Sequence, residues 1–342
     1  MTEARLNMKF KNNMDAKLEP ESECVSSSTC NSDAAPDIDG RGKIPVYINP
    51  EPIFFDILRT KLNKVDIDVQ EFAFPKGKID LLRWAWKLGT SKPKIVHYLG
   101  GYHHPIIYII PKFLGKRVIV HWMGTDVLYA TSNKAVTPTY LLRRFAYRVV
   151  DLHLADFEPL ADELKSIGIN ARVVPLIPDM ALSPEDTIWP SENAILVYLP
   201  EGREEFYGGS IAFGLAEELP DLRFLIVGNS GKGMPQLANI EFLGWVNLST
   251  VWKRVKVYLR LTKHDGQAKM VLEALARGKQ VIWSYKYPFC HQARTIEQAR
   301  DALKDILDNN QPNTQAMDWA QRTFDPSKMA QTYRNIYLGI SR

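Results

Sequence analysis

Cysteine is scarce in this sequence of 342 residues. Cys24, Cys30 and Cys290 are odd in number and show no CxxC spacing, which argues against a disulfide scaffold or a zinc site and fits a reducing cytosol. No run approaches 18 apolar residues, so we expect no membrane-spanning segment. The first residues also lack the apolar core of a signal peptide. We therefore expect a cytoplasmic protein.

Concentrated positive charge is missing too, although the net charge is +4. No block of Lys and Arg stands out, which argues against a nucleic-acid partner. With 45% hydrophobic and 24% charged residues, the composition is that of an ordinary globular protein. The length favours two domains of about 150 residues each.

Large apolar side chains are rare in residues 1–42, which are rich in Ser and Asp. Such a segment buries too little surface to offset the entropy of ordering it. We predict a disordered tail over residues 1–42.

Strand and helix patterns alternate in residues 43–180, which predicts a parallel sheet covered by helices. The expected strands are Ile44–Asn49, Val65–Phe72, Lys94–Leu99, Arg117–His121, Asp151–Ala155 and Ala171–Pro175. The expected helices are Ile53–Leu62, Ile79–Leu88, Tyr102–Phe113, Tyr140–Arg148 and Pro159–Ile167. Residues 181–193 carry prolines, acids and no periodicity, so we predict a linker there.

The alternation restarts in residues 194–325, which we predict to be a second domain of the same kind. Its expected strands are Ala194–Leu199, Leu222–Val227, Ile240–Gly244, Val255–Leu261 and Gln280–Trp283. Its expected helices are Ser210–Glu218, Gln267–Arg277, Ile296–Leu307 and Thr314–Thr323. Residues 326–342 contain a last helix, Ser327–Leu338.

The stretch Leu259–Trp283 is the most informative part of the chain, because it predicts a strand, a loop, a helix and a strand. The amino end of such a helix attracts anions, and Lys263 and Lys269 flank it, so the place suits a phosphate or diphosphate. Two simpler interpretations stay open. Asp265 can be a helix cap. Lys269, Glu273 and Arg277 can form a solvated ion-pair stripe at i, i+4 and i+8.

This stretch resembles the signature of the family-4 retaining glycosyltransferases, which is E-G-F-G, then L-E-A, then G-x-P-V-I, with two acids eight positions apart. The residues that stand in those places are Asp265-Gly266-Gln267-Ala268, Leu272-Glu273-Ala274 and Gly278-Lys279-Gln280-Val281-Ile282. The spacing is kept, whereas the first Glu is Asp265 and the Pro is Gln280.

The resemblance implies an α/β protein of GT-B architecture, with two Rossmann-like domains whose parallel sheets face a cleft and a C-terminal helix that crosses back to the first domain. It implies transfer of a sugar from a nucleotide-diphosphate sugar to a hydroxyl of a glycan or lipid-linked acceptor, with retention of configuration. No metal and no cofactor besides the donor are expected.

The resemblance assigns most donor-binding positions to the second domain. In the family, a G-R pair followed by K-G binds the donor diphosphate; here Gly202-Arg203 and Gly208 match, but Tyr207 stands in or near the place of the Lys. Gly228-Asn229-Ser230-Gly231 resembles a V-G-x-G turn near the nucleotide. The expected donor-binding residues are Arg203, Gly208, Gly228, Lys263, Gly266, Gln267, Ala268, Lys269 and Glu273.

Two turns of the first domain are expected on the acceptor side. His121-Trp122-Met123-Gly124-Thr125-Asp126 resembles the family's H-G-S-D segment, and Gly100-Gly101 follows another strand. The expected acceptor residues are Gly100, Gly101, Gly124 and Thr125, and the expected catalytic residues are Asp126, His121 and Asp265. Asp126 as a cap and His121 as a core residue remain alternatives. His103 and His104 are adjacent, so their side chains point apart and make a poor metal site.

Aromatic and basic residues mix in Leu81–Lys87 and Lys112–Arg117. Such stretches can lie at an anionic membrane surface, which leaves peripheral contact with the inner face of the membrane as an open expectation. A pair of Trp residues on a helix is more often core packing. Two further functions also stay open. These are a nucleotide-sugar epimerase and a non-catalytic sugar-nucleotide binder or partner subunit.

Overall fold

The computed structural model describes residues 42–50, 54–101, 104–132, 137–178, 182 and 184–341. The tail predicted for residues 1–42 lies outside these ranges except for Gly42, as do Tyr102 and His103. The described chain forms two compact units. The N-terminal unit comprises the described residues of Ala35–Ala181, His264–Glu273 and Gln321–Arg342. The C-terminal unit comprises those of Leu182–Lys263 and Ala274–Ala320.

The N-terminal unit is built on a six-stranded sheet in which every pairing is parallel. The strand order is β2-β1-β3-β4-β5-β6. The strands are β1 Ile44–Ile48, β2 Ile67–Glu71, β3 Ile95–Leu99, β4 Arg117–Trp122, β5 Leu152–Ala155 and β6 Ala171–Val173. The inner strands β1 and β3 are buried along their whole length, as expected when helices cover both faces of a parallel sheet.

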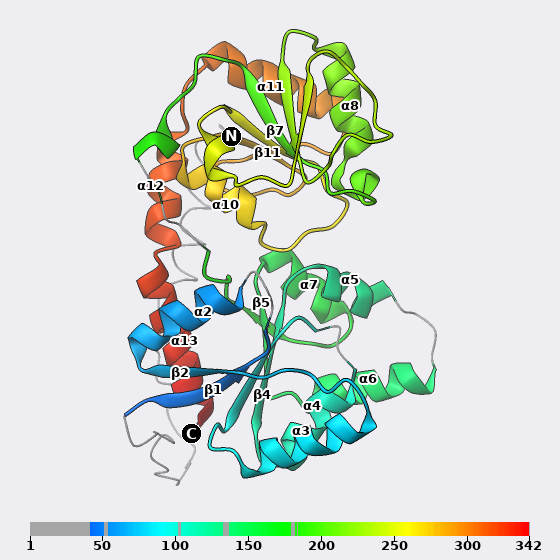
Figure 1. Ribbon diagram of the computed structural model, residues 1–342, viewed down its shortest axis with the longest axis vertical. Helices are drawn as coiled ribbons and strands as arrows, with labels where there is room; N and C mark the ends of the chain where they lie inside the picture. Colours follow the sequence, from blue (N-terminus) through cyan, green and yellow to red (C-terminus); the bar gives the residue numbers. More distant parts are fainter. Residues whose placement is uncertain are drawn as a thin grey trace, which may run out of the picture. The chain divides into compact units, whose positions relative to one another are not determined.

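Helices connect the strands of this sheet (Figure 1). They are α2 Phe55–Leu62, α3 Lys78–Thr90, α4 Ile106–Phe113, α5 Thr125–Ser132, α6 Pro138–Arg148 and α7 Glu158–Ser166, with a 3-10 turn η1 Asn63–Val65. Contacts join α3 to α4 and α4 to α6, whereas α2 contacts the last helix of the chain, α13 Pro326–Ser341.

Two tyrosines anchor α13 to the N-terminal sheet. The Tyr337 hydroxyl lies 2.8 Å from Nδ1 of His97 on β3, and the Tyr333 hydroxyl donates to the carbonyl of Pro175 at 3.2 Å. The rings of His97 and His121 stack with centroids 5.6 Å apart. Because all four side chains are fully buried, α13 is an integral layer of the N-terminal unit.

The C-terminal unit contains a second six-stranded parallel sheet, in the order β12-β11-β10-β7-β8-β9. Its strands are β7 Ala194–Tyr198, β8 Arg223–Val227, β9 Ile240–Gly244, β10 Val257–Arg260, β11 Gln280–Trp283 and β12 His291–Gln292. The other elements are η2 Pro184–Thr187, η3 Glu204–Tyr207, α8 Gly209–Glu218, α9 Ser249–Trp252, α11 Ile296–Asn309 and most of α12 Thr314–Thr323. The helix α10 Lys269–Ala276 lies between β10 and β11 in the chain, and its residues up to Glu273 belong to the N-terminal unit.

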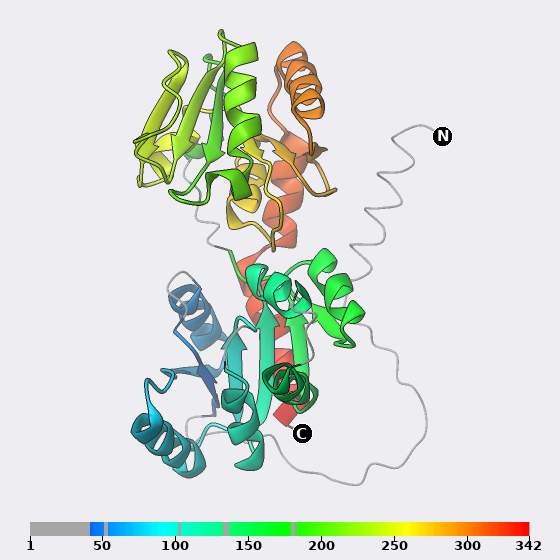
Figure 2. The ribbon, with the colours of Figure 1, turned by 90° about the vertical axis from the view of Figure 1, so that its right-hand side faces the viewer.

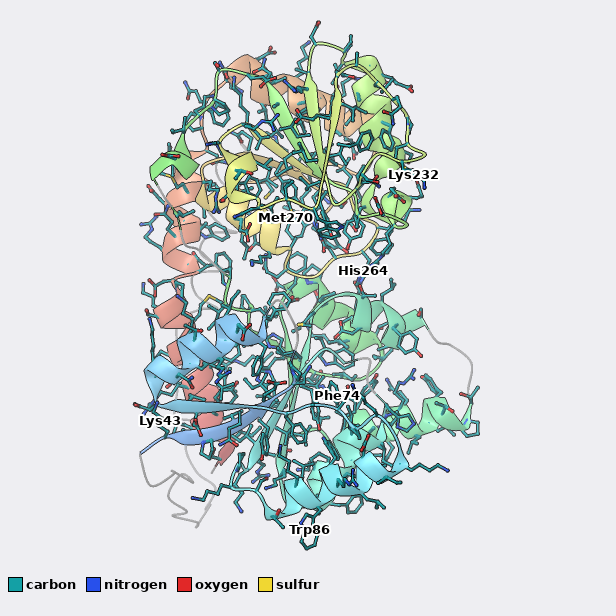
Figure 3. All side chains as sticks on the ribbon, in the orientation of Figure 1. Lys43, Phe74, Trp86, Lys232, His264 and Met270 are labelled. Atoms are coloured by element: carbon teal, nitrogen blue, oxygen red, sulfur yellow. The ribbon has the colours of Figure 1, made fainter. Side chains whose placement is uncertain are left out.

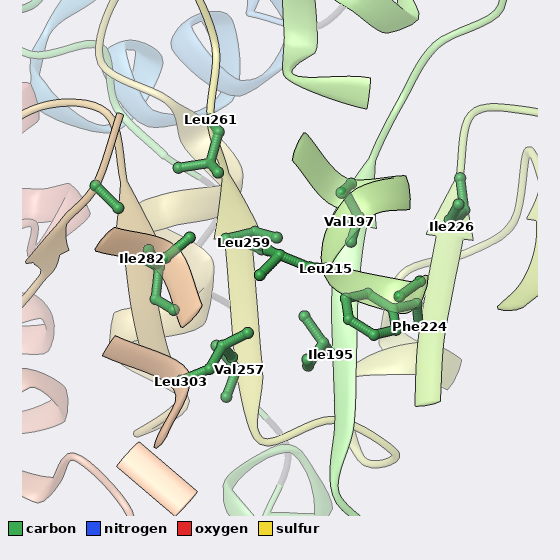
Figure 4. Packing of buried hydrophobic residues seen from close by; sticks show 14 of the residues in the cluster. Ile195, Val197, Leu215, Phe224, Ile226, Val257, Leu259, Leu261, Ile282 and Leu303 are labelled. Atoms are coloured by element: carbon green, nitrogen blue, oxygen red, sulfur yellow. The ribbon is translucent and has the colours of Figure 1, made fainter. Parts of the chain in front are cut away.

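The core of this unit is formed by side chains from neighbouring strands that point to the same face of the sheet. Figure 4 shows Val197 of β7, Leu259 of β10 and Ile226 of β8 in this layer. The helices α8 and α11 contact each other and cover it (Figures 1 and 2). Leu215 and Leu303, one from each helix, are at most 1% exposed in this cluster.

The structure differs from the predicted elements mainly at loops next to strand ends. The predicted helix Tyr102–Phe113 is α4, which begins only at Ile106, and α5 was not predicted because Gly124-Thr125 favours a turn. The predicted helix Gln267–Arg277 is α10, which begins at Lys269. Residues 266–268 are therefore a loop that precedes the helix.

Within the described ranges, no helix combines the length and the apolar character needed to cross a bilayer.

Candidate functional site

Asp126 lies at the carboxyl edge of the N-terminal sheet, in the first turn of α5. Its carboxylate accepts hydrogen bonds from the backbone N–H groups of Gly101 (2.7 Å), Met123 (3.0 Å), Gly124 (2.8 Å) and Val127 (2.9 Å). Burial raises the pKa of Asp126, and the four donors oppose that rise. Its carboxylate thus ties together the turns that follow β3 and β4, in agreement with the alternative that it is a capping group.

The glycines of these turns are required by close packing. A β-carbon on Gly101 would overlap the Trp122 ring, and Gly124, at φ +130°, allows the backbone of Gly266 to approach it. Gly100 has φ +88° and donates its N–H to the carbonyl of His121 at 2.8 Å. Thr125 is the first residue of α5. The structure therefore brings Gly100, Gly101, Gly124 and Asp126 together.

The side chain of His121, on β4, points into the core toward α13 and away from this edge. Its ring is fully buried beneath α13, and Nε2 donates to the carbonyl of Val174 at 2.8 Å. Burial lowers the pKa of His121 to about 4, so the ring is neutral at pH 7. This environment is that of a satisfied core histidine, the alternative left open by the sequence.

Residues 264–268, in the loop that precedes α10, belong to the N-terminal unit by their contacts. A β-carbon on Gly266 would overlap the carbonyl oxygen of Met123, and Nε2 of His264 lies 3.0 Å from the carboxylate of Glu163 on α7. Figure 3 labels His264 in this loop. Asp265 is 9% exposed. The sequence pattern, in contrast, places this loop in the second domain.

Asp156, which follows β5, is a buried acid that the sequence does not single out. It is 3% exposed, and its Oδ1 has no hydrogen-bond partner among the described residues. Burial raises its pKa well above 3.8; the charges of Asp126 and Asp265 add to that rise, and the N–H of Gln267 opposes it. Burial therefore favours the protonated form of this carboxyl. The one signal in the sequence is its position at the end of a parallel strand.

The first turns of α10 carry the predicted pair Lys269 and Glu273. Their charged groups lie 3.6 Å apart, and their side chains are 28% and 11% exposed. The predicted solvated stripe does not extend along the helix, because Arg277 is buried with its guanidinium 5.6 Å from the centre of the Trp252 ring. Gln267 and Ala268 lie in the loop before the helix, where the carbonyl of Ala268 accepts the N–H of Val271.

The carboxyl edge of the C-terminal sheet contains two glycine turns. Gly208 caps α8 at φ +80°, and a β-carbon there would overlap the carbonyl of Leu261. Gly228 has φ +84°, and its β-carbon would stand 2.9 Å from the Tyr198 ring. Both positions therefore require glycine for close approach, and they bring the loops after β7, β8 and β10 together.

Two arginines flank Tyr207 at this edge. The guanidinium of Arg203 lies 4.7 Å from the centre of the Phe206 ring and 5.4 Å from that of Tyr207. The guanidinium of Arg260, the last residue of β10, lies 5.3 Å from the Tyr207 ring and 5.9 Å from the Tyr198 ring. The Tyr207 ring thus has two permanent positive charges close to it. The sequence does not single out Arg260, because it ends an otherwise apolar strand.

Lys263 follows Arg260 closely but has a different environment. Its ammonium lies 3.2 Å from the carboxylate of Glu205, and both side chains are more than 60% exposed. Beside it is a pocket of about 250 Å³, lined by Gly208, Ser210, Lys263, Ser284, Tyr285 and Arg294 among others. The pocket lies wholly within the C-terminal unit.

No group of three or more His, Cys, Asp and Glu side chains suited to a metal ion occurs in the part of the chain that the structure describes.

No protein-family model matches this chain, and no curated protein sequence does either. Solved structures do match. The complex of Anabaena Alr3699/HepE with UDP and glucose aligns with a TM-score of 0.61 at 12% identity, over 86% of this chain and 99% of the other. Sucrose-phosphate synthase from Thermosynechococcus elongatus aligns with a TM-score of 0.58 at 11% identity, over 87% and 100%.

A third similar structure is the pneumococcal O-GlcNAc transferase GtfA in complex with UDP and GlcNAc. It aligns with a TM-score of 0.55 at 12% identity, over 76% of this chain and 60% of the other. Together with the two six-stranded parallel sheets, these similarities confirm the predicted fold class: the chain has the Rossmann-like, two-sheet GT-B fold.

Proposed function

We propose that this protein is a glycosyltransferase that moves a sugar from a nucleotide-diphosphate sugar to an acceptor hydroxyl. The two most direct supports are the fold and the names of similar structures, which include a transferase bound to UDP. We further propose that the base of the donor is uracil, that configuration is retained and that no metal is needed.

The observation that carries the proposal is the pair of arginines around Tyr207. A planar guanidinium binds phosphate oxygens through paired hydrogen bonds and keeps its charge at every physiological pH. The guanidinium groups of Arg203, in the loop after β7, and of Arg260, at the end of β10, lie 5.4 Å and 5.3 Å from the centre of the Tyr207 ring. In our proposal Arg260 supplies the second positive charge that the family obtains from a Lys at this place.

In the reaction, the bond from the anomeric carbon to the β-phosphate oxygen breaks and a bond to the acceptor oxygen forms. The acceptor hydroxyl gives up its proton, and the nucleoside diphosphate leaves with the bonding electrons. Negative charge on the leaving group must be stabilised, and fixed cations do this best where water is scarce. Arg203 and Arg260 have this role in our proposal. From the resemblance, Asp265 is proposed for the sugar hydroxyls and Glu273 for the ribose.

The first test is a thermal-shift titration of the purified chain with UDP, GDP and ADP, each with and without EDTA. Stabilisation by UDP that EDTA leaves unchanged is expected, since a ligand that binds only the folded state raises the melting temperature. Stabilisation that EDTA abolishes would contradict metal independence. The absence of a shift with every nucleotide would contradict the proposal.

Two single variants and a matched control locate the diphosphate. Arg203→Ala and Arg260→Ala should each weaken UDP binding about tenfold, which is roughly 1.4 kcal/mol. Arg223→Ala is the control, because Arg223 starts β8 at the opposite edge of the same sheet and pairs with Glu192 and Glu241. Equal affinity in all three variants would contradict the role of the arginine pair.

A rescue experiment tests the replacement itself. Tyr207→Lys should restore most of the UDP affinity lost in Arg260→Ala, because it returns a cation to the same place. In the wild-type background it should give little gain, since a third positive charge would stand beside two others. Improvement of the wild type by Tyr207→Lys, with no rescue of Arg260→Ala, would show that Arg260 does not take the place of the Lys.

Assays of turnover separate the remaining functions. Release of UDP from a UDP-sugar that depends on an acceptor hydroxyl is the result expected of a transferase. Conversion of the UDP-sugar without any acceptor would indicate an epimerase. Binding of UDP-sugar without turnover under any acceptor would indicate a non-catalytic binder or partner subunit.

A further inference from the structure

The helix α3 presents an apolar stripe to solvent on its outer side. Ile79, Leu82 and Trp86 stand at i, i+3 and i+7, so they share one face, and they are 68%, 73% and 76% exposed. The opposite face of the helix packs into the core through Trp84 and Leu88, both buried. Figure 3 shows Trp86 directed away from the ribbon. The two tryptophans of this helix therefore differ: Trp84 is core and Trp86 is surface.

The end of α4 continues this apolar surface. Phe113, its last residue, is 81% exposed, and Leu114 follows it. The Leu114 side chain lies 3.7 Å from the place of a β-carbon on Gly89, which is in the last turn of α3. The apolar residues at the end of α4 therefore border the end of α3.

The helix α6 contacts α4 and also exposes apolar side chains. Leu141, Leu142 and Phe145 are between 43% and 57% exposed. The outer sides of the three helices, which we call the α3/α4/α6 face, thus hold eight of the thirteen large apolar side chains exposed in the described part of the chain. Single exposed apolar side chains are common on protein surfaces, whereas such a concentration of them on one face is typical of a binding surface.

The helices that carry this apolar surface are predominantly basic, although Lys112 pairs with Asp151 at 2.7 Å. The helices α3, α4 and α6 together carry seven Lys and Arg and a single acid, Asp80. Arg144 and Arg148 stand three residues after Leu141 and Phe145 respectively, so they border the apolar side of α6, and they line a pocket of about 230 Å³ with the backbone at Gly168. The partner must therefore accept apolar side chains and offer negative charge.

We infer that the α3/α4/α6 face binds the surface of an anionic lipid bilayer. Aliphatic and aromatic side chains enter the interface between headgroups and acyl chains, while Lys and Arg contact lipid phosphates. A second copy of the chain would bring two predominantly basic surfaces together, which Coulomb repulsion opposes. The inference that this face binds lipid does not depend on the proposed function. The further step, that the acceptor hydroxyl belongs to a lipid-linked molecule, does rest on that function.

Flotation with lipid vesicles tests this inference on the full chain. Wild-type protein should float with vesicles of phosphatidylcholine and phosphatidylglycerol. Neutral phosphatidylcholine vesicles should bind it far less, and about 0.5 M salt should weaken binding to the anionic ones. Equal binding to both kinds of vesicle, or none to the anionic kind, would overturn the inference.

A double variant and a matched control locate the binding face. Trp86→Ser with Phe113→Ser should reduce partitioning onto anionic vesicles tenfold or more, which is about the effect of withdrawing two large apolar groups. Trp245→Ser, in the C-terminal unit, removes a tryptophan of equal exposure, 77% against 76%, and should bind like wild type. Equal binding by the double variant and the wild type would overturn the assignment.

Two further measurements distinguish the bilayer from a second copy of the chain and from the nucleotide site. Sedimentation velocity without lipid should show no self-association that the double variant removes; such association would identify a second copy as the partner instead. UDP binding in solution should be unchanged in the double variant. If the double variant loses vesicle binding but keeps UDP binding, the result supports the bilayer surface without testing the proposed function. If the wild type does not bind UDP, the result contradicts the proposed function and leaves the bilayer surface unaffected.

Discussion

The two sheets of this protein use their carboxyl edges in different ways. At the N-terminal edge an acid turns inward, and Asp126 accepts four backbone N–H groups. At the C-terminal edge cations stack on aromatic rings, and Arg203, which caps no helix through its side chain, is exposed. The first edge satisfies its own polar groups and thereby fixes the shape of its turns. The second places permanent positive charge beside aromatic rings.

The largest expected effect concerns the inward-facing acid. Asp126→Ala should lower the free energy of unfolding by about 3 kcal/mol or more, because several buried N–H groups lose their acceptor at once. Urea unfolding measures this. The control is Asp162→Ala, whose carboxylate is 65% exposed and pairs with Lys165, and it should stay within about 0.5 kcal/mol of wild type. Equal stability of the two variants would break the contrast between the edges.

A smaller effect is expected from the glycine that packs against the same turns. Gly266→Ala should cost roughly 1–3 kcal/mol, since the new methyl group would meet the backbone of Met123 and force it to move. Gly89→Ala is the control, for which we expect no loss of stability. It lies in helix α3 with only ordinary contact to Leu114 and should be neutral or stabilising by up to about 1 kcal/mol. A neutral Gly266→Ala would mean that this loop is not closely packed.

The raised pKa of Asp156, beside these turns, makes the stability of the protein depend on pH. Because burial raises the pKa of Asp156 above 3.8, the folded protein holds this proton more tightly than the unfolded chain does. The stability from this proton is present below 3.8 and is lost as pH rises through the interval up to the raised pKa. Asp156→Asn mimics the neutral acid, so its urea midpoint should rise relative to wild type as pH increases from about 4 to 8. A constant difference would indicate an ordinary carboxyl.

The smallest effect should come from Lys263. Its pair with Glu205 is exposed on both sides, so Lys263→Ala should change stability by about 0.5 kcal/mol or less. If Arg203 and Arg260 bind the diphosphate, the UDP affinity of Lys263→Ala should be less than about threefold below that of the wild type in a direct titration. A tenfold loss of UDP affinity would indicate that the diphosphate binds in the pocket that Lys263 lines rather than at Arg203 and Arg260.

Much of the fold could be predicted because the alternation of apolar strands and amphipathic helices is a local pattern. Ile240–Gly244 and Thr314–Thr323 were predicted with the bounds that the structure has. The errors occur where a polar turn and a short helix have the same composition. Thus α5 was missed after Gly124, and α10 begins at Lys269 rather than at Gln267.

The candidate site was harder to predict because it depends on where side chains point. The strand ends at which Asp126 and Gly101 stand follow from the local pattern, but the hydrogen bond from Gly101 to Asp126 does not. His121 and Trp122 are adjacent on β4, yet one ring faces α13 and the other packs on Tyr147 of α6. Arg260 and Asp156 carry no motif at all. Each gains its role from loops that are distant in sequence, and only the tertiary structure brings these together.

The composition of the N-terminal unit has a consequence for how the protein is made. This unit consists of its first stretch of chain together with residues 264–273 and α13. The described C-terminal unit, in contrast, is one stretch of chain that is interrupted only by residues 264–273. On the ribosome, the sheet from β1 to β6 would emerge early with His97 and His121 uncovered. It would have to wait for Tyr333 and Tyr337 of α13, which follow β6 in the chain only after the strands of the second sheet. The N-terminal sheet is therefore covered only after the second sheet has been synthesised, and a fragment cut at the boundary near residue 181 would expose those two histidines.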